Sequence, residues 1–232
     1  MRQMVWLARL LTHTLQRSAV LISGTVALAV CGDAPNAELS VEDFLGPEPG
    51  KTYIYQGEGL RVEVLGVERL SSTSVRVRQT QTLSMAEGNN VSSTTSYDVS
   101  AVGGELLQES GGKQQILLKE PIRDGARPWS IDLEMVGGGV DLATCRVKSV
   151  GESVVISATL PTVTVECISE VKGLPVFEGD HPEQSFVLTR KFAKTIGLVS
   201  EQYSLMIGSD SVSVTSKDLE EIVDGSLTSD PR

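Results

Sequence analysis

Aromatic residues, histidine and cysteine are scarce in this 232-residue chain. Only 4% of the residues are aromatic, two are histidines and three are cysteines. So few aromatic rings argue against a platform that stacks on sugars or nucleic-acid bases. Zinc sites need several His or Cys ligands at characteristic spacings, which these residues lack, so the sequence predicts no metal site and no other cofactor.

Long hydrophobic runs are also missing, apart from one short stretch near the N-terminus. Residues 19–30 are mostly apolar or small, and the segment before them contains three arginines, Arg2, Arg9 and Arg17, and no acidic residue. A cationic segment followed by a short apolar run is typical of a secretory signal peptide, which we expect over residues 1–30. A retained membrane anchor is a weaker alternative, because a span needs about 20 apolar residues to cross ~30 Å of hydrocarbon.

The residues that close this run, Leu28-Ala29-Val30-Cys31, resemble the lipobox of bacterial lipoproteins. That resemblance implies a diacylglycerol on the Cys31 thiol, cleavage before the cysteine and attachment to a membrane through the lipid. The odd number of cysteines agrees with it, because an acylated Cys31 leaves an even pair behind. Ordinary secretion, with cleavage after Ala29, is the alternative.

The remainder of the chain is strongly acidic. Residues 32–232 carry 17 basic and 30 acidic side chains. This balance repels phosphate backbones and anionic headgroups, so we expect no nucleic-acid partner and membrane contact through the lipid alone. In a Gram-negative host, Gly32 replaces the aspartate that often retains lipoproteins in the inner membrane, which favours the periplasmic face of the outer membrane. We expect a lipidated N-terminus and tether over residues 31–50, a β-rich domain over 51–217 and an acidic tail over 218–232.

Period-two alternation of apolar and polar residues runs through most of the domain, as in Leu60-Arg61-Val62-Glu63-Val64, and glycine-rich turns separate the runs. Such short strands predict an antiparallel all-β fold, either a β-sandwich or a half-open barrel. Leu219 to Val223, with its acidic residues, is expected to form one short C-terminal helix. The expected strands are 52–56, 60–64, 75–83, 92–99, 105–108, 115–119, 130–135, 142–149, 153–160, 162–170, 185–192, 198–207 and 211–216.

Two similar segments lead into strands about 75 residues apart. Pro47-Glu48-Pro49-Gly50 precedes Tyr53, and Pro121 and Gly125 precede Trp129. This pattern indicates either two related halves of one sheet or merely two similar loops.

A second resemblance rests on these proline–glycine segments, on Val163-Thr164-Val165-Glu166-Cys167 and on Ile196-Gly197-Leu198-Val199. Over residues 42–216 the chain resembles the TapB-like group of bacterial envelope proteins, whose aromatic-rich strand often ends in Gly-x-Gly-Leu-Val. Thr195 stands here in place of the first glycine. The resemblance implies a β-rich envelope domain and carries over no catalytic residue.

Cys145 and Cys167 both occupy inward-facing positions of their expected strands, and inward cysteines in an oxidising compartment often form a disulfide. If the strand over 153–160 lay between them, their Cα atoms would be about 9.6 Å apart, beyond the ~7 Å that a bridge allows. A bridge therefore needs strands that face each other across a sandwich, or a strand order other than a meander. Two separate buried thiols are the alternative.

His181 lies beside Asp180 and close to Ser185, which suggests a catalytic triad. No Gly-x-Ser-x-Gly motif accompanies these residues, and a histidine next to a proline in a polar segment is typical of a loop. The sequence therefore predicts no enzyme and assigns no catalytic residue.

The main hypothesis is a non-enzymatic lipoprotein of the bacterial cell envelope, acting as a binding or assembly module for an unknown envelope protein or apolar ligand. One alternative is a LolA/LolB-like carrier of lipid or other apolar ligands, and another is a hydrolase that uses His181. A carrier would need a large apolar cavity, whereas a scaffold should have a filled core.

Overall fold

One antiparallel sheet of twelve strands makes up the body of the computed structural model, which describes residues 38–84, 89–134, 140–170, 184–207 and 210–224. A short 3-10 turn, η1 (Val41–Phe44), precedes the sheet. The strands are β1 (Lys51–Gly57), β2 (Leu60–Ser71), β3 (Ser74–Ser84), β4 (Asn90–Val102), β5 (Glu105–Ser110), β6 (Lys113–Lys119), β7 (Trp129–Glu134), β8 (Val140–Val155), β9 (Ala158–Glu170), β10 (Gln184–Ala193), β11 (Gly197–Ile207) and β12 (Asp210–Asp224).

The strand order is β6-β5-β4-β3-β2-β1-β12-β11-β10-β9-β8-β7. The chain first runs through a meander, β1 to β6, out to one edge of the sheet. It then continues at the other edge and returns through a second meander, β7 to β12, which pairs with β1. The two proline–glycine segments each precede the first strand of one meander.

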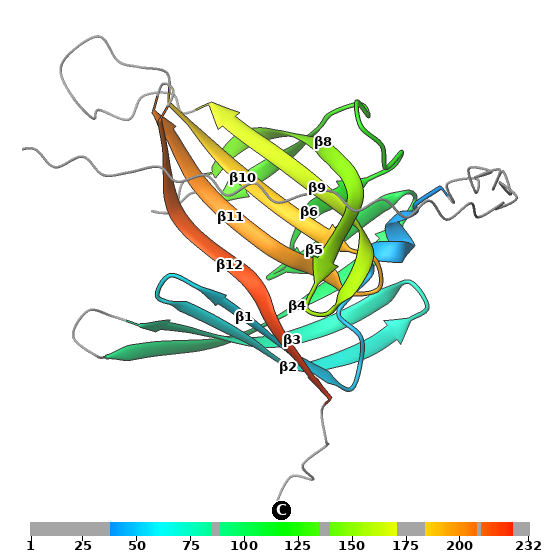
Figure 1. Cartoon of the computed structure of the whole chain (residues 1–232), viewed down its shortest axis with the longest axis vertical. Coiled ribbons are helices and arrows are strands. Elements are labelled where there is room, and N and C mark those ends of the chain that lie inside the picture. The colour runs from blue at the N-terminus through cyan, green and yellow to red at the C-terminus, as the bar shows by residue number, and fades with distance from the viewer. Residues whose placement is uncertain (1–37, 85–88, 135–139, 171–183, 208–209, 225–232) are drawn as a thin grey trace, which may run out of the picture. The chain divides into compact units, whose positions relative to one another are not determined.

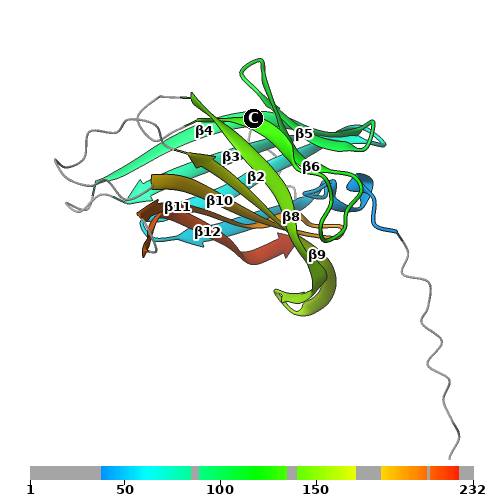
Figure 2. The same cartoon turned by 90° about the horizontal axis from the view of Figure 1, so that it is seen from above.

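The sheet coils so strongly that its two halves face each other, with β12 passing from one half to the other (Figures 1 and 2). The all-β antiparallel prediction is confirmed, and the nearly closed single sheet corresponds to the half-open barrel rather than the sandwich. Edge strands β6 and β7 approach each other without forming a ladder. This unpaired seam between the edges is where the candidate site lies.

Alternation along the strands decides which side chains fill the interior. Val62 and Val64 of β2, and Val75 and Val77 of β3, are almost completely buried, while the charged residues between them face outward. Together with side chains from the other half they form one large apolar core. The largest fully buried side chains are Tyr53, Phe44, Phe192, Leu106, Leu118, Val41, Val62, Val64, Val75, Val77, Val163 and Val165.

The expected C-terminal helix is wrong, because Leu219 to Val223 belong to β12. Leu219 pairs with Tyr55 and Ile222 with Tyr53, and the register shifts between Ile54 and Tyr55. A β-bulge of this kind adds one residue to a strand. Two apolar residues three positions apart therefore share one face of the strand, which imitates the spacing of a helix. Among the described residues, no helix is long and apolar enough to cross a membrane.

The folded body extends past both boundaries expected from the sequence. Val41 and Phe44, in the segment assigned to a tether, are fully buried. The backbone amide of Thr195 donates to the carbonyl of Asp43 at 2.7 Å, which ties η1 to the turn between β10 and β11. At the other end, β12 continues to Asp224, inside the segment assigned to an acidic tail.

Candidate functional site

Several residues singled out from the sequence, Cys31, Asp180 and His181, lie outside the described residues. Ser185 is described, at the start of β10, where it pairs with Glu170 of β9 and Met206 of β11. Of the suggested triad the described part of the chain therefore contains Ser185 alone, and no hydrolytic geometry can be built on it.

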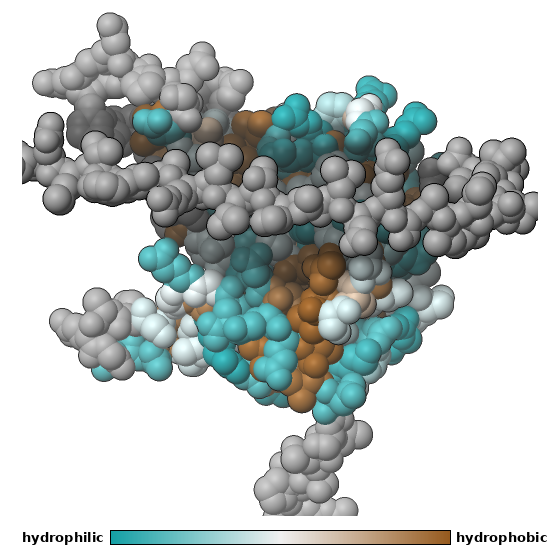
Figure 3. Space-filling model, viewed as in Figure 1, coloured by the Kyte–Doolittle hydropathy of each residue, from teal (hydrophilic) through white to brown (hydrophobic). Residues whose placement is uncertain are grey.

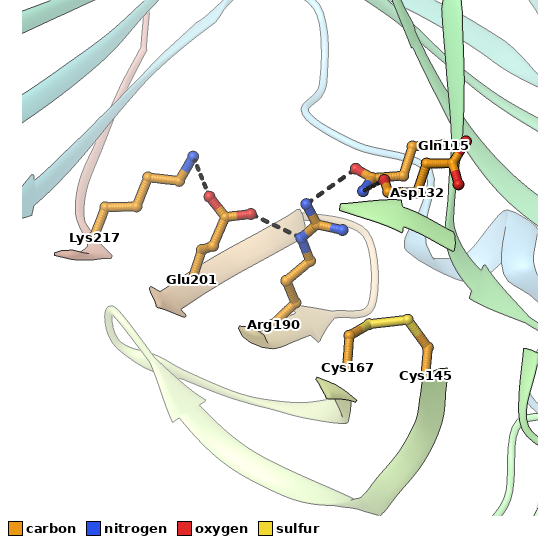
Figure 4. Close-up of polar contacts among 7 residues, drawn as sticks. All are labelled: Gln115, Asp132, Cys145, Cys167, Arg190, Glu201 and Lys217. Carbon is orange, nitrogen blue, oxygen red and sulfur yellow. Dashed lines mark hydrogen bonds and ion pairs between the residues drawn. A yellow bond between two sulfur atoms is a disulfide. The ribbon is translucent and has the colours of Figure 1, made fainter. Parts of the chain in front are cut away.

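Cys145 of β8 and Cys167 of β9 stand directly opposite each other and are joined by a disulfide (Figure 4). The expectation of a separate strand over 153–160 was wrong: residues 140–155 form one long strand that turns back at once into β9. With neighbouring strands the Cα atoms lie 3.9 Å apart. The bridge therefore needs neither a sandwich nor an unusual strand order.

A cleft of about 520 Å³ opens along the seam between the two edges of the sheet. Its walls come from the hairpin of β5 and β6, the end of β7 and the inward faces of β10 and β11. Most of the lining side chains are polar or charged. They are Gln108, Ser110, Lys113, Gln114, Gln115, Asp132, Leu133, Leu188, Arg190, Glu201 and Tyr203.

Charged and amide side chains form a continuous chain across the floor of this cleft (Figure 4). The Lys217 ammonium lies 3.0 Å from Oε1 of Glu201, and Nε of Arg190 donates to Oε2 of the same carboxylate at 2.7 Å. Nη2 of Arg190 then donates to Oε1 of Gln115 at 3.1 Å, and Nε2 of Gln115 donates to the carbonyl of Asp132 at 3.4 Å. The chain thereby links β12, β11 and β10 to both edge strands.

The network keeps Glu201 ionised far below the ordinary range of a glutamate. Burial alone would raise the pKa of this carboxyl, but the charges of Lys217 and Arg190 and the hydrogen bonds they donate outweigh burial and lower it from 4.5 to about 2. Glu201 is therefore a fixed negative charge at every physiological pH.

Arg190 is the unusual member of the network. The residue is only 8% exposed, and among the described residues no atom accepts a hydrogen bond from its Nη1. Two other buried side-chain atoms, Nε1 of Trp129 and Oγ of Ser169, also lack a partner there, but neither carries a charge. A buried charged donor without an acceptor is costly, more so than a neutral one.

Behind the cleft the interior is nearly full. A void of about 30 Å³ shares Gln108 and Arg190 with the cleft and is otherwise lined mainly by apolar and aromatic side chains such as Tyr55, Tyr97 and Phe192. On the face shown in Figure 3, polar side chains surround an apolar strip. The exposed apolar residues of β12 include Val214 and Val223. Neither this void nor the cleft is a large apolar cavity of the kind that a lipid carrier would need.

The network was not predicted from the sequence, although the alternation of apolar and polar residues contains a signal for it. Arg190 lies between Leu188 and Phe192 at two-residue spacing, and all three are buried. Glu201 likewise lies two positions before the buried Tyr203, whereas Val199 on its other side stands at a register shift and packs in a separate cluster. A charged residue on the apolar face of a strand marks a buried polar site, but the strand alone does not reveal the partners.

No protein-family model matches the chain, and no curated protein matches it either. Solved structures with a similar course of the backbone include a putative lipoprotein from Parabacteroides distasonis, with 12% identity and a TM-score of 0.47 over 77% of this chain and 97% of that one. They also include a putative exported protein with a YmcC-like fold from Bacteroides fragilis, with 11% identity and a TM-score of 0.46 over 77% of this chain and 98% of that one.

Proposed function

We propose that the protein is a lipoprotein of the bacterial cell envelope, anchored through an acylated Cys31, whose β-rich body is a non-enzymatic binding module. The lipobox-type leader over residues 1–30 supports the anchor, and Cys31 stands seven positions before Glu38, the first described residue. Cys145 and Cys167 lie opposite each other on adjacent strands, an arrangement that suits a disulfide. Such bonds persist in oxidising compartments outside the cytosol.

The cleft at the open seam carries the binding role. Its volume lies in the range of small-molecule sites, roughly 300–1,000 Å³, and a buried charged network forms its floor. Charged groups are costly to bury, so a network that only stabilised the sheet could have been replaced by apolar residues. Its place on the floor of an open cleft supports recognition of a ligand.

The alternatives have less support. A LolA/LolB-like carrier of apolar ligands needs an apolar cavity, whereas Arg190, Glu201 and other charged or amide side chains line this cleft beside its apolar residues. A hydrolase using His181 gains nothing from the described residues, among which Ser185 is the only member of the suggested triad. The resemblance to TapB-like envelope domains favours the envelope module, and in a Gram-negative host we place it at the periplasmic face of the outer membrane.

Fractionation of cells that express the full-length chain tests the anchor. The wild-type protein should sediment with membranes and be released by detergent, whereas Cys31→Ser should not be acylated and should leave the detergent-extracted fraction. The double variant Cys145→Ser/Cys167→Ser removes the other two cysteines and should still sediment with membranes. Wild-type protein recovered from the soluble cell interior would overturn the proposal.

A further inference from the structure

We infer that the cleft binds a small amphipathic anion, whose carboxylate or phosphate group is held by the guanidinium of Arg190 and whose apolar part packs on Leu133 and Leu188. This inference rests on the proposed binding role of the cleft and adds the chemical class of the ligand.

The charges of the network do not balance. Arg190 and Lys217 are two cations, and both contact the single carboxylate of Glu201. One positive charge is therefore left over at a largely buried position, in a chain whose residues 32–232 carry 30 acidic and only 17 basic side chains. Buried charges are unfavourable unless they are paired. A second anion next to Arg190 would complete the pairing.

The other charged groups near the cleft do not supply that anion. The Asp132 carboxylate points away from Arg190 (Figure 4). Lys113 also lines the cleft, but it is a cation and cannot supply an anion. The charge of Asp141 acts on Tyr203, whose pKa is raised first by burial and then by this carboxylate. Asp141 is not among the residues that line the cleft.

Arg190 offers the geometry that an oxyanion needs. Its Nε is occupied by Glu201, but Nη2 donates only to the neutral amide oxygen of Gln115, and Nη1 donates to no described atom. Two oxygens of a carboxylate or phosphate can accept from Nη1 and Nη2 side by side. Charge-assisted bidentate bonds of this kind are roughly twice as strong as neutral ones.

Gln115 is the residue that has to move. Its side chain bridges Arg190 and the backbone of β7, and the bond from its Nε2 to the Asp132 carbonyl is long, at 3.4 Å. Nη1 is buried in this arrangement. The ligand therefore reaches the arginine when the Gln115 side chain swings out of the seam, so Gln115 covers the guanidinium until the ligand binds.

The apolar lining selects against a purely inorganic ion. Leu133, Leu188 and Tyr203 line the same cleft as Arg190, and the Tyr203 ring is held by Phe186 at a centroid distance of 5.7 Å. A volume of about 520 Å³ leaves room for an aromatic or short aliphatic group beside the charged end.

Isothermal titration of the mature acylated protein in a non-ionic detergent tests the charge class with four probes that share a phenyl ring: the planar benzoate, benzamide and benzamidinium, and phenyl phosphate. We expect benzoate or phenyl phosphate to bind at least tenfold more tightly than benzamide, and benzamidinium not to bind. The tighter of the two anions identifies the oxyanion. Arg190→Lys keeps the charge but loses the planar fork, so the affinity for the anion should fall at least tenfold.

The matched control is Arg146→Lys, at an exposed arginine paired with Glu166 on the outer face, which should leave the affinity unchanged. Gln115→Ala removes the residue that covers the fork and should bind the anion at least as tightly as the wild type. In nitrogen-15 spectra of the arginine side chains of the wild-type protein, the Arg190 signals should shift when benzoate is added. This measurement does not depend on the folding of any variant.

The outcomes separate the two claims. Equal affinity for benzamide and benzoate would overturn the inference that the ligand is an anion. It would leave standing the proposal that the cleft binds a ligand. Unshifted Arg190 signals at saturating concentrations of both anions would overturn the inference without touching the lipid anchor, which fractionation tests separately.

Discussion

At the scale of single residues, the most unusual choice is to place charges on inward-facing strand positions. Arg190 and Glu201 pair directly across β10 and β11, and Glu201 and Lys217 contact each other across β11 and β12. The Glu201 carboxylate is kept ionised by its two cationic neighbours, so the network acts as a unit. Replacing one residue of the network should therefore lower stability by more than the loss of that residue's own contacts would.

The protonation of Glu201 should make stability depend on acidity. Because its pKa is about 2 in the folded state, against 4.5 ordinarily, the unfolded chain takes up the proton first as the pH falls. The resulting stabilisation, of the order of 3 kcal/mol, is present above about pH 4.5 and disappears toward pH 2. Urea denaturation between pH 7 and pH 2 measures it.

Two variants assign that effect to Glu201. Glu201→Gln should be less stable at pH 7, because it leaves Arg190 and Lys217 without their anion, and its stability should fall less steeply with acid. Asp98→Asn, in an exposed pair with Arg76, should change the pH 7 stability little. An acid slope identical to wild type in Glu201→Gln would contradict the assignment.

Gly46 should not tolerate any side chain. It packs against the turn between β10 and β11, where a Cβ atom would collide with the backbone carbonyl of Ile196 and the amide of Gly197. Gly46→Ala should lower the free energy of unfolding by about 2 kcal/mol or more. Gly151→Ala, where nothing lies within 4 Å of the added atom, should be neutral or slightly stabilising by thermal denaturation.

At the scale of elements, the turn between β8 and β9 contains a β-branched residue in an unfavourable backbone conformation. Ile156 has a φ of 58°, a region that β-branched residues rarely adopt. Because its side chain is 48% exposed, Ile156→Gly loses little packing and should raise the free energy of unfolding by about 1 kcal/mol. Val154→Gly, at a 74% exposed strand position next to the turn, should lower it instead.

The disulfide stabilises the same hairpin at its other end. It closes a loop with a sequence separation of 22, so removing it in Cys145→Ala/Cys167→Ala should lower the free energy of unfolding by about 3 kcal/mol. Urea denaturation of the oxidised wild type and the variant measures this. If thiol titration of the native protein found Cys145 and Cys167 free, the expected difference would have no basis.

Element types were largely predictable and element ends were not. The alternation in Val62, Val64, Val75 and Val77 predicts strands that the structure contains. The long β8 was split in the prediction at Gly151, because a glycine in a strand resembles a turn. Leu219 was assigned to a helix because a bulge gives a strand the spacing of a helical turn. Both errors arise because the spacing of residues along one strand does not show where that strand pairs with its neighbour.

At the scale of the whole molecule, local patterns cannot predict which strands meet. The all-β class follows from alternation, but the order that leaves β6 and β7 unpaired depends on contacts between distant parts of the chain. The site depends on the same contacts: Gln115 and Arg190 are 75 positions apart and come from different meanders. The sequence therefore predicted the fold class and missed the cleft.

The proposed lipid anchor and the proposed binding cleft involve different parts of the chain and can be tested separately. An acidic body repels anions over most of its surface, so we expect an anion to bind at the cationic groups on the floor of the cleft. The lipid would hold this body at a membrane whose anionic headgroups it otherwise avoids.

Intact-mass spectrometry of the mature chain, extracted from membranes, tests the anchor directly. The account predicts a polypeptide that starts at Cys31 and carries the added mass of a diacylglycerol, with or without a further acyl chain. A chain that starts at Met1, or an unmodified chain cleaved after Ala29, would contradict it.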